Sequence, residues 1–77
     1  MREKIYIIIA ETVGCDIKIL NERTNLVEEL NIDSLQVIRM LIDIEDQLGI
    51  EIDFEIFELS LLNCLESFCE FLLRDVL

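Results

Sequence analysis

The 77-residue sequence contains no histidine. Histidine is the most frequent general base in enzymes and the most frequent metal ligand, because its imidazole changes protonation near neutral pH. A serine–histidine or cysteine–histidine nucleophile therefore cannot be assembled within this chain. A chain of this length is also small for a substrate pocket. We expect a protein that is not an enzyme.

Proline is also absent, and glycine occurs only twice, at Gly14 and Gly49. A turn-rich β fold needs more of both residues, so this composition favours helices. Hydrophobic residues make up 53% of the chain, which compensates for the thin core of a domain this small. The length predicts a single domain spanning residues 1–77.

Long apolar runs are missing as well. The longest uncharged stretch covers residues 59–65, whereas a membrane helix needs about 20 apolar residues. Arg2, Glu3 and Lys4 are followed by only six apolar residues before Glu11, which is too few for a secretory signal peptide. The sequence therefore predicts no membrane span and a cytoplasmic location.

Cysteine is sparse and unevenly spaced. Cys15, Cys64 and Cys69 are an odd number without CxxC spacing, and a zinc site would need a fourth ligand. We expect three reduced thiols and no metal site, with Cys64 and Cys69 in or near the core.

Positive charge is scarce: 6 basic residues face 17 acidic ones, for a net charge of −11. Such a surface repels DNA and RNA and attracts proteins that present basic patches. A calcium-binding EF-hand loop counted from Asp43 fails, because Leu48 takes the glycine position and Phe54 the glutamate position. An unmodified acidic adaptor that binds a basic partner remains an alternative interpretation.

Hydrophobic spacing predicts two helices in the first two thirds of the chain. The first spans residues 2–13 and ends at Gly14; its inward face comprises Ile5, Ile8, Ile9, Thr12 and Val13. Residues 15–32 form a long loop with a helical turn at 26–30. The second and strongest helix spans residues 34–48 and ends at Gly49; its predicted apolar face comprises Leu35, Ile38, Leu41, Ile42, Ile44, Glu45 and Leu48.

The last third predicts a short helix and a longer one. A short helical turn is expected at residues 53–59, and the final helix begins with Asn63 as N-cap and Glu66 as capping-box partner. The final helix should turn six residues inward: Leu65, Phe68, Cys69, Leu72, Leu73 and Val76. The predicted fold is all-α, a small four-helix bundle with a long loop between helices one and two and a short third helix.

The most informative stretch is Asn31-Ile32-Asp33-Ser34-Leu35. Asp33 is a good N-cap, and Gln36 can return a side-chain hydrogen bond, which together form a capping box. Ser34 then lies in the first turn of a helix, where free N–H groups and the positive end of the helix dipole favour a covalently attached phosphate.

The residues around Ser34 resemble the acyl carrier protein family. The family motif is a hydrophobic pair, two acids, leucine, glycine, any residue and then Asp-Ser-Leu, and residues 26–35 read LVEELNIDSL. The similarity continues through Ile38, Leu41, Ile42, Ile44, Glu45, Asp46 and Leu48, through Gly49-Ile50-Glu51-Ile52, and returns at Asn63-Cys64.

The resemblance implies a function and a site. Ser34 would be the attachment residue for 4′-phosphopantetheine, transferred from coenzyme A by a phosphopantetheinyl transferase with magnesium. The arm's thiol would hold acyl groups as thioesters, and loading enzymes and synthases with basic docking patches would bind the second helix of a monomeric carrier. The recognition residues would be Asp33, Leu35, Gln36, Arg39, Ile42, Glu45 and Asp46.

Several positions depart from the family pattern. Asn31 replaces the motif glycine, and asparagine tolerates left-handed backbone geometry better than most residues. Gln36 and Arg39 replace frequent acids, and Asp53 replaces a common proline. Because Arg39 would repel a basic docking patch, these changes favour a specialised pathway over general fatty-acid synthesis. Asp33 favours acyl cargo, and an aminoacyl or peptidyl carrier of the nonribosomal type is the alternative.

Overall fold

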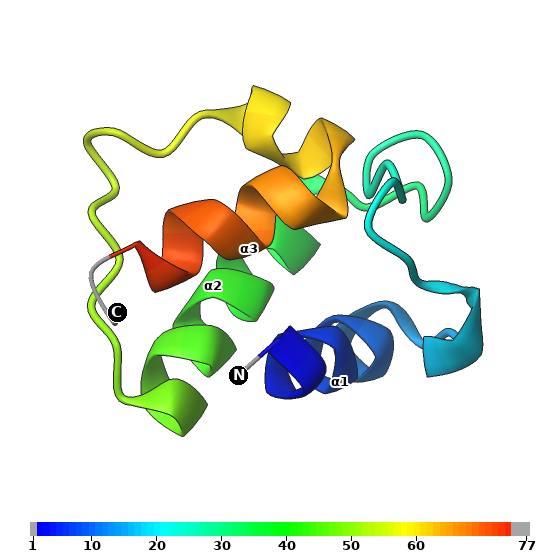
Figure 1. The fold of residues 1–77 in the computed structure, drawn as a ribbon, viewed down its shortest axis with the longest axis horizontal. Coiled ribbons are helices and arrows are strands. Elements are labelled where there is room, and N and C mark those ends of the chain that lie inside the picture. The colour runs from blue at the N-terminus through cyan, green and yellow to red at the C-terminus, as the bar shows by residue number, and fades with distance from the viewer. Residues whose placement is uncertain (1, 75–77) are drawn as a thin grey trace.

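The computed structural model describes residues 2–74 (Figure 1). It contains the α-helices α1 (Arg2–Val13), α2 (Ser34–Leu48) and α3 (Leu65–Leu73), and the 3-10 helices η1 (Ile17–Ile19) and η2 (Leu59–Asn63). No strand occurs between residues 2 and 74. The all-α prediction is confirmed, as are the first two helices and their glycine ends, since Gly14 and Gly49 have φ values of 74° and 65°.

The predicted short third helix at residues 53–59 does not form. Residues 54–56 make a turn in which the Asp53 side chain accepts the N–H of Glu55 at 3.0 Å. The N–H of Ile56 also donates to Asp53 O at 3.3 Å, but this turn is not continued into a helix, and the short helical element follows later as η2. Over residues 2–74 the chain therefore has three α-helices and two 3-10 helices instead of a four-helix bundle.

The core lies between the three α-helices. Ile5 and Ile9 of α1, Met40 and Ile44 of α2, and Phe68 of α3 are fully buried. At the edge of the core, the ring of Phe57 packs edge-on against Phe68 and tilted against Phe71. The inward residues predicted for α3 are buried from Leu65 through Leu73, and Val76 lies outside the described residues.

The predicted apolar face of α2 is partly wrong. Leu35, Ile38 and Ile42 are 73%, 52% and 49% exposed, and the inward face consists of Val37, Met40, Leu41 and Ile44. Apolar residues occupy two sides of this helix, so spacing alone did not distinguish them. The packing of α1 against α2 decided which side is buried.

The predicted cap of α3 is also wrong, because Cys64 takes the N-cap position and makes no side-chain capping bond. The first N–H groups of α3 instead bond to the long loop: Leu65 N donates to Thr24 O, and Glu66 N donates to Glu22 O, both at 2.9 Å. The loop thus supplies the carbonyl groups that satisfy the start of this helix.

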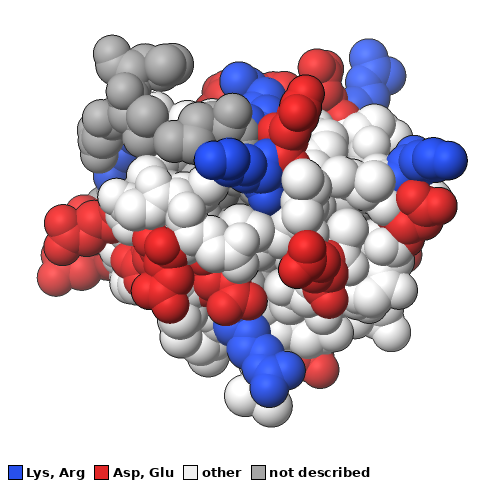
Figure 2. Space-filling model, turned by 90° about the horizontal axis from the view of Figure 1, so that it is seen from below, with Lys and Arg blue, Asp and Glu red and all other residues white. Residues whose placement is uncertain are grey.

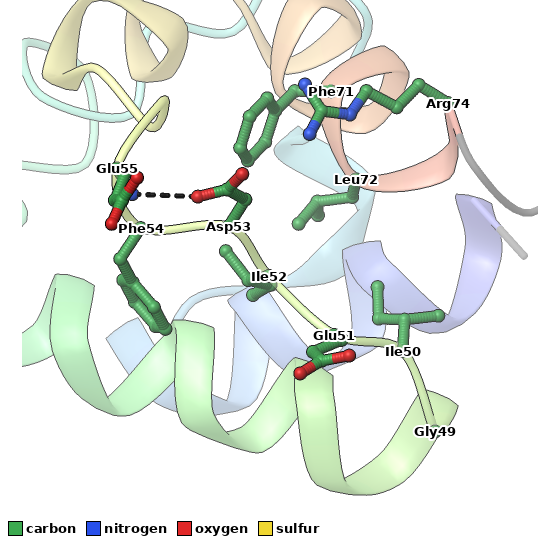
Figure 3. A pocket seen from close by; sticks show the side chains of 10 residues that line it. All are labelled: Gly49, Ile50, Glu51, Ile52, Asp53, Phe54, Glu55, Phe71, Leu72 and Arg74. Carbon is green, nitrogen blue, oxygen red and sulfur yellow. Dashed lines mark hydrogen bonds between the residues drawn. The ribbon is translucent and has the colours of Figure 1, made fainter.

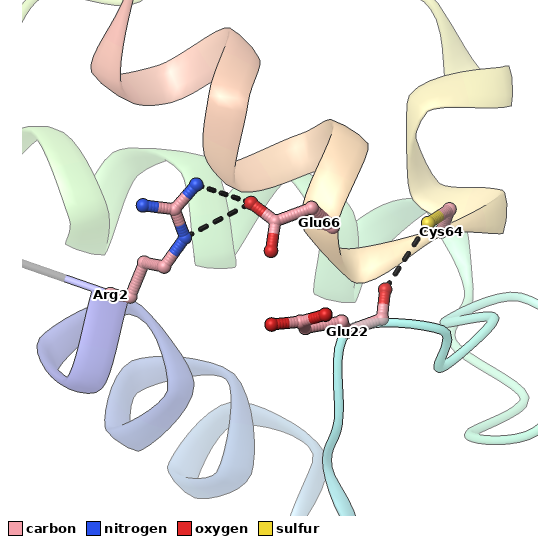
Figure 4. A network of polar contacts seen from close by, with 4 residues as sticks. All are labelled: Arg2, Glu22, Cys64 and Glu66. Carbon is pink, nitrogen blue, oxygen red and sulfur yellow. Dashed lines mark hydrogen bonds and ion pairs between the residues drawn. The ribbon is translucent and has the colours of Figure 1, made fainter.

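Side chains extend the contact between the N-terminal half and α3 (Figure 4). The Arg2 guanidinium forms an ion pair with the Glu66 carboxylate, which raises the pKa of Arg2. The Cys64 thiol donates to Glu22 O at 3.1 Å. Because the ion pair is exposed to solvent, it adds little to the free energy of unfolding, and the backbone bonds are the stronger constraint.

All three cysteines are free thiols, as predicted. Cys69 is fully buried, whereas Cys64 and Cys15 are partly exposed. Within residues 2–74, no group of three potential ligands could hold a metal ion. In the same part of the chain, none of the helices combines the length and the apolar character that crossing a bilayer requires.

Burial of Cys69 predicts a pH-dependent stability. Desolvation raises the pKa of the Cys69 thiol from 9.0 to about 11, so the folded protein holds this proton more tightly than the unfolded chain does. The resulting stabilisation is complete below pH 9 and is lost as the pH rises towards 11. Urea unfolding should show the free energy of unfolding falling more steeply across this interval in wild type than in Cys69→Ala. If the free energies of unfolding of the two proteins changed in parallel with pH, the raised pKa of Cys69 would be contradicted.

Candidate functional site

The site begins at the first residue of α2. Asp33 has extended backbone geometry, and its carboxylate accepts the N–H of Gln36 at 2.8 Å. The Gln36 side chain returns the bond by accepting Asp33 N at 3.1 Å. The predicted capping box is therefore confirmed, and it presents the exposed Ser34 as the first helical residue.

The backbone segment that leads to Ser34 contains one residue in the left-handed conformation. Asn31 has φ of 52°, the only positive φ outside glycine in residues 2–74, which is consistent with the tolerance expected of asparagine. The preceding turn starts at Asn25, whose side chain accepts the N–H groups of Val27 and Glu28 at 3.0 and 2.9 Å. The helical turn predicted at residues 26–30 is thus present as a hydrogen-bonded turn.

Buried leucine and isoleucine side chains anchor this approach on both sides of the turn. Leu26 is fully buried, and its N–H donates to Leu62 O at 2.8 Å. Ile32 is buried directly before Asp33, and its N–H donates to Leu26 O at 3.4 Å. The attachment candidate therefore extends from a fixed segment and not from a free loop.

A hollow of about 410 Å³ lies beside Ser34, between the start of α2 and η2. Ile32, Val37 and Leu62 are buried and form its floor, while the more exposed Val27 and Leu59 form its rim. Polar groups at its edge come from Asp33, Ser34, Ser60 and Asn63. Sequence reasoning missed Ser60 and placed Asn63 in a capping role.

The predicted recognition residues of α2 separate into two groups. Leu35, Arg39, Ile42 and Asp46 follow one another by about one turn and are exposed, so they share one outward ridge. Gln36 and Glu45 instead hold internal bonds: Gln36 completes the cap, and the Glu45 carboxylate accepts Ile52 N at 2.8 Å.

Arg39 lies at the edge of a second hollow. This hollow, of about 400 Å³ between α1 and α2, is also lined by Glu11 and Asp43. Within residues 2–74, Arg39 forms no ion pair with either of these carboxylates. Ile38, which was not predicted as a recognition residue, adds a third apolar side chain to the exposed part of α2.

A third hollow, of about 640 Å³, is at the other end of α2 (Figure 3). Its wall is the chain from Gly49 to Glu55, together with Phe71, Leu72 and Arg74, whose guanidinium lies 5.0 Å from the Phe71 ring centre. Since α2 has 15 residues, this hollow is roughly 20 Å from Ser34 along the helix. It contains none of the predicted site residues.

Carboxylates are spread over the surface. Figure 2 shows one face with acidic groups in several places, uncharged areas between them and no continuous basic area. The first turn of α2 contains no acidic side chain. A phosphate attached there would meet the positive end of the helix dipole, and the carboxylate adjacent to it in sequence is the capping Asp33.

Comparison with known proteins identifies the family. The family model for the phosphopantetheine attachment site matches residues 3–72. The chain is also 36% identical over 55 residues to the acyl carrier protein of Syntrophobacter fumaroxidans (strain DSM 10017 / MPOB), across 71% of this chain and 68% of that protein. This chain belongs to the acyl carrier protein family.

Acyl carrier proteins hold a covalently attached 4′-phosphopantetheine as their cofactor. The residues at the start of α2 in this acyl carrier protein fit such a group. Ser34 offers an exposed hydroxyl, and the N–H of Leu35 makes no hydrogen bond within the described residues, so it can meet a phosphate oxygen.

The cap of α2 predicts a stability difference between two substitutions. Asp33→Ala removes the acceptor for Gln36 N and should lower the free energy of unfolding by about 1 kcal/mol. Asp33→Asn keeps a good capping side chain without the negative charge, so its loss should be a few tenths of a kcal/mol at most. Urea unfolding of both variants measures this, and equal losses would show that charge, rather than capping, is what Asp33 contributes.

Proposed function

We propose that this protein carries acyl intermediates as thioesters on a 4′-phosphopantetheine arm attached to Ser34, and delivers them to the enzymes of a biosynthetic pathway. The observation that supports this assignment is the exposed Ser34 hydroxyl at the N-terminus of α2, which the Asp33 side chain caps. The arm supplies the thiol that forms the thioester.

Attachment to Ser34 is a phosphoryl transfer performed by a separate transferase. The Ser34 oxygen attacks the pantetheine-bearing phosphorus of coenzyme A and forms a phosphodiester bond. The bond from that phosphorus to the bridging pyrophosphate oxygen breaks, and adenosine 3′,5′-bisphosphate leaves. The hydroxyl proton passes to a base of the transferase, because this chain has no histidine and its one carboxylate adjacent to Ser34, Asp33, holds the helix cap.

The chain itself positions and presents the attachment point. Asp33 and Gln36 hold the helix start, and Asn31 turns the backbone into it. The outward ridge of Leu35, Arg39, Ile42 and Asp46 faces solvent and offers partners a docking surface. We further propose that the carrier works as a cytoplasmic monomer, performs no catalysis and binds a phosphopantetheinyl transferase, loading enzymes and synthases.

The side chains of the outward ridge also indicate which kind of pathway the partner enzymes belong to. Near Ser34 it carries two apolar side chains and Arg39, and its acid, Asp46, comes only in the fourth turn. A partner that docks through a basic patch would therefore face a positive charge close to the reacting group. We infer that the partners belong to a specialised pathway, such as polyketide synthesis, rather than to general fatty-acid synthesis.

The attachment is tested by intact mass. Incubation with a broad-specificity phosphopantetheinyl transferase, coenzyme A and magnesium should add one phosphopantetheine to the wild type and none to Ser34→Ala. Circular dichroism establishes that both proteins are folded. Absence of any addition to the folded wild type would contradict the carrier function and favour the unmodified adaptor.

The pathway is tested by exchanging the charge at Arg39. Wild-type carrier that bears phosphopantetheine should be a poor substrate for a malonyl transferase of bacterial fatty-acid synthesis. Arg39→Glu should raise kcat/KM of this transfer about tenfold, because it removes like-charge repulsion. Lys18→Glu is the matched control, since it makes the same charge change in η1, outside α2. Efficient use of the wild type, or equal gains in both variants, would contradict the specialised pathway.

A further inference from the structure

Four exposed residues of α2 form a compact patch, which we call the Arg39 patch: Leu35, Ile38, Arg39 and Ile42. Each of them lies three or four positions from two of the others, so all four are neighbours on the helix surface. The three apolar members are 73%, 52% and 49% exposed. The patch begins directly after Ser34, in the N-terminal half of α2. Apolar side chains exposed together in this way commonly mark a surface that another protein covers.

A single guanidinium lies among these apolar side chains. Arg39 is the only basic residue of α2, and the nearest basic residues along the chain are Arg23 and Arg74. Leu35 lies one turn before Arg39 and Ile42 lies one turn after it, so a partner that covers both also covers Arg39. Arginine surrounded by apolar side chains is typical of the residues that dominate the binding energy of protein interfaces.

The carboxylates of the chain do not neutralise Arg39. Glu11 and Asp43 line the same hollow between α1 and α2, yet Arg39 forms no ion pair in the described part of the chain. Asp43 follows Arg39 by four positions, and this order is less favourable for a helical pair than an acid that precedes the base. A partner that excluded water from Arg39 would thus bury an uncompensated charge, which is costly unless the partner supplies the counter-charge.

The overall charge of the protein acts at longer range than this contact. The net charge of −11 attracts partners whose whole surface is basic. That attraction is largely screened beyond about 8 Å at physiological ionic strength, whereas a charge within the contact acts directly. The Arg39 patch contains no acid. A partner can therefore be basic overall and still need one carboxylate where it meets α2.

We propose that the enzymes that bind this carrier cover the Arg39 patch with an apolar surface that presents an aspartate or glutamate carboxylate to Arg39. Two N–H groups of the guanidinium can donate to the two carboxylate oxygens in a bidentate pair. Because the patch adjoins Ser34, such a pair fixes the orientation of the partner at the reacting group. A carboxylate at this position is the reverse of a basic docking patch, and its assignment rests on the proposed function.

Exchange of charge between carrier and enzyme tests this contact. The probe is a malonyl transferase of bacterial fatty-acid synthesis, in which each arginine or lysine of the docking patch is replaced in turn by glutamate. Wild-type carrier and Arg39→Glu are first loaded with phosphopantetheine, and intact mass verifies each product. One of the substituted transferases should raise kcat/KM for the wild-type carrier about tenfold and lower it about tenfold for Arg39→Glu, because the attractive and repulsive pairs are exchanged.

Two matched controls separate the contact from general effects. Lys18→Glu makes the same charge change in η1 and should behave as the wild type with each transferase. Ile38→Ala should lower kcat/KM with the favoured substituted transferase about fivefold, as expected for an apolar residue at the centre of an interface. Ile7→Ala truncates an exposed isoleucine of α1 and should leave this value unchanged. Circular dichroism establishes that all variants are folded.

The possible results are distinguishable. If no substituted transferase gained activity with the wild-type carrier, or if Arg39→Glu gained equally from the same substitution, the carboxylate contact would be overturned and the attachment at Ser34 would stand. Equal effects of Ile38→Ala and Ile7→Ala would overturn the apolar part of the contact. Failure of the wild type to load would instead overturn the proposed function.

Discussion

The arrangement of this protein depends on backbone hydrogen bonds between the long loop and the η2–α3 segment. Thr24 and Glu22 accept the first N–H groups of α3, and Leu26 N donates to Leu62 O. Without these bonds the start of α3 would be unsatisfied and the loop would be free at its centre. Because the bonds hold Leu26 in the core, the segment that follows enters α2 in a defined direction and presents Ser34 at the surface.

Helix α2 serves two purposes through its two faces. The face of Val37, Met40, Leu41 and Ile44 packs into the core, which gives the helix a fixed position. The opposite ridge remains exposed although it carries leucine and isoleucine side chains, which is consistent with its proposed role as a docking surface. The high net negative charge counteracts self-association through this apolar ridge.

Internal hydrogen bonds distinguish the residues of α2 that stabilise the structure from those that face solvent. Gln36 and Glu45 resemble surface groups in the sequence, yet one closes the helix cap and the other holds the chain at Ile52. Arg39 and Asp46 have no such hydrogen bond in the described chain and project outward. The same family motif can thus contain side chains that stabilise the site and side chains that are available to a partner.

The sequence by itself determined the helical class, the bounds of α1 and α2, the capping box at Asp33 and the attachment candidate, because these depend on contacts within a few residues. The buried face of α2, the loop carbonyls that replace Asn63 as the cap of α3, the position of η2 and the hollow beside Ser34 were decided by the tertiary structure. Each of these joins segments far apart in the chain, such as Thr24 with Leu65. Local spacing carries no information on which distant segment will satisfy a helix end or cover an apolar face.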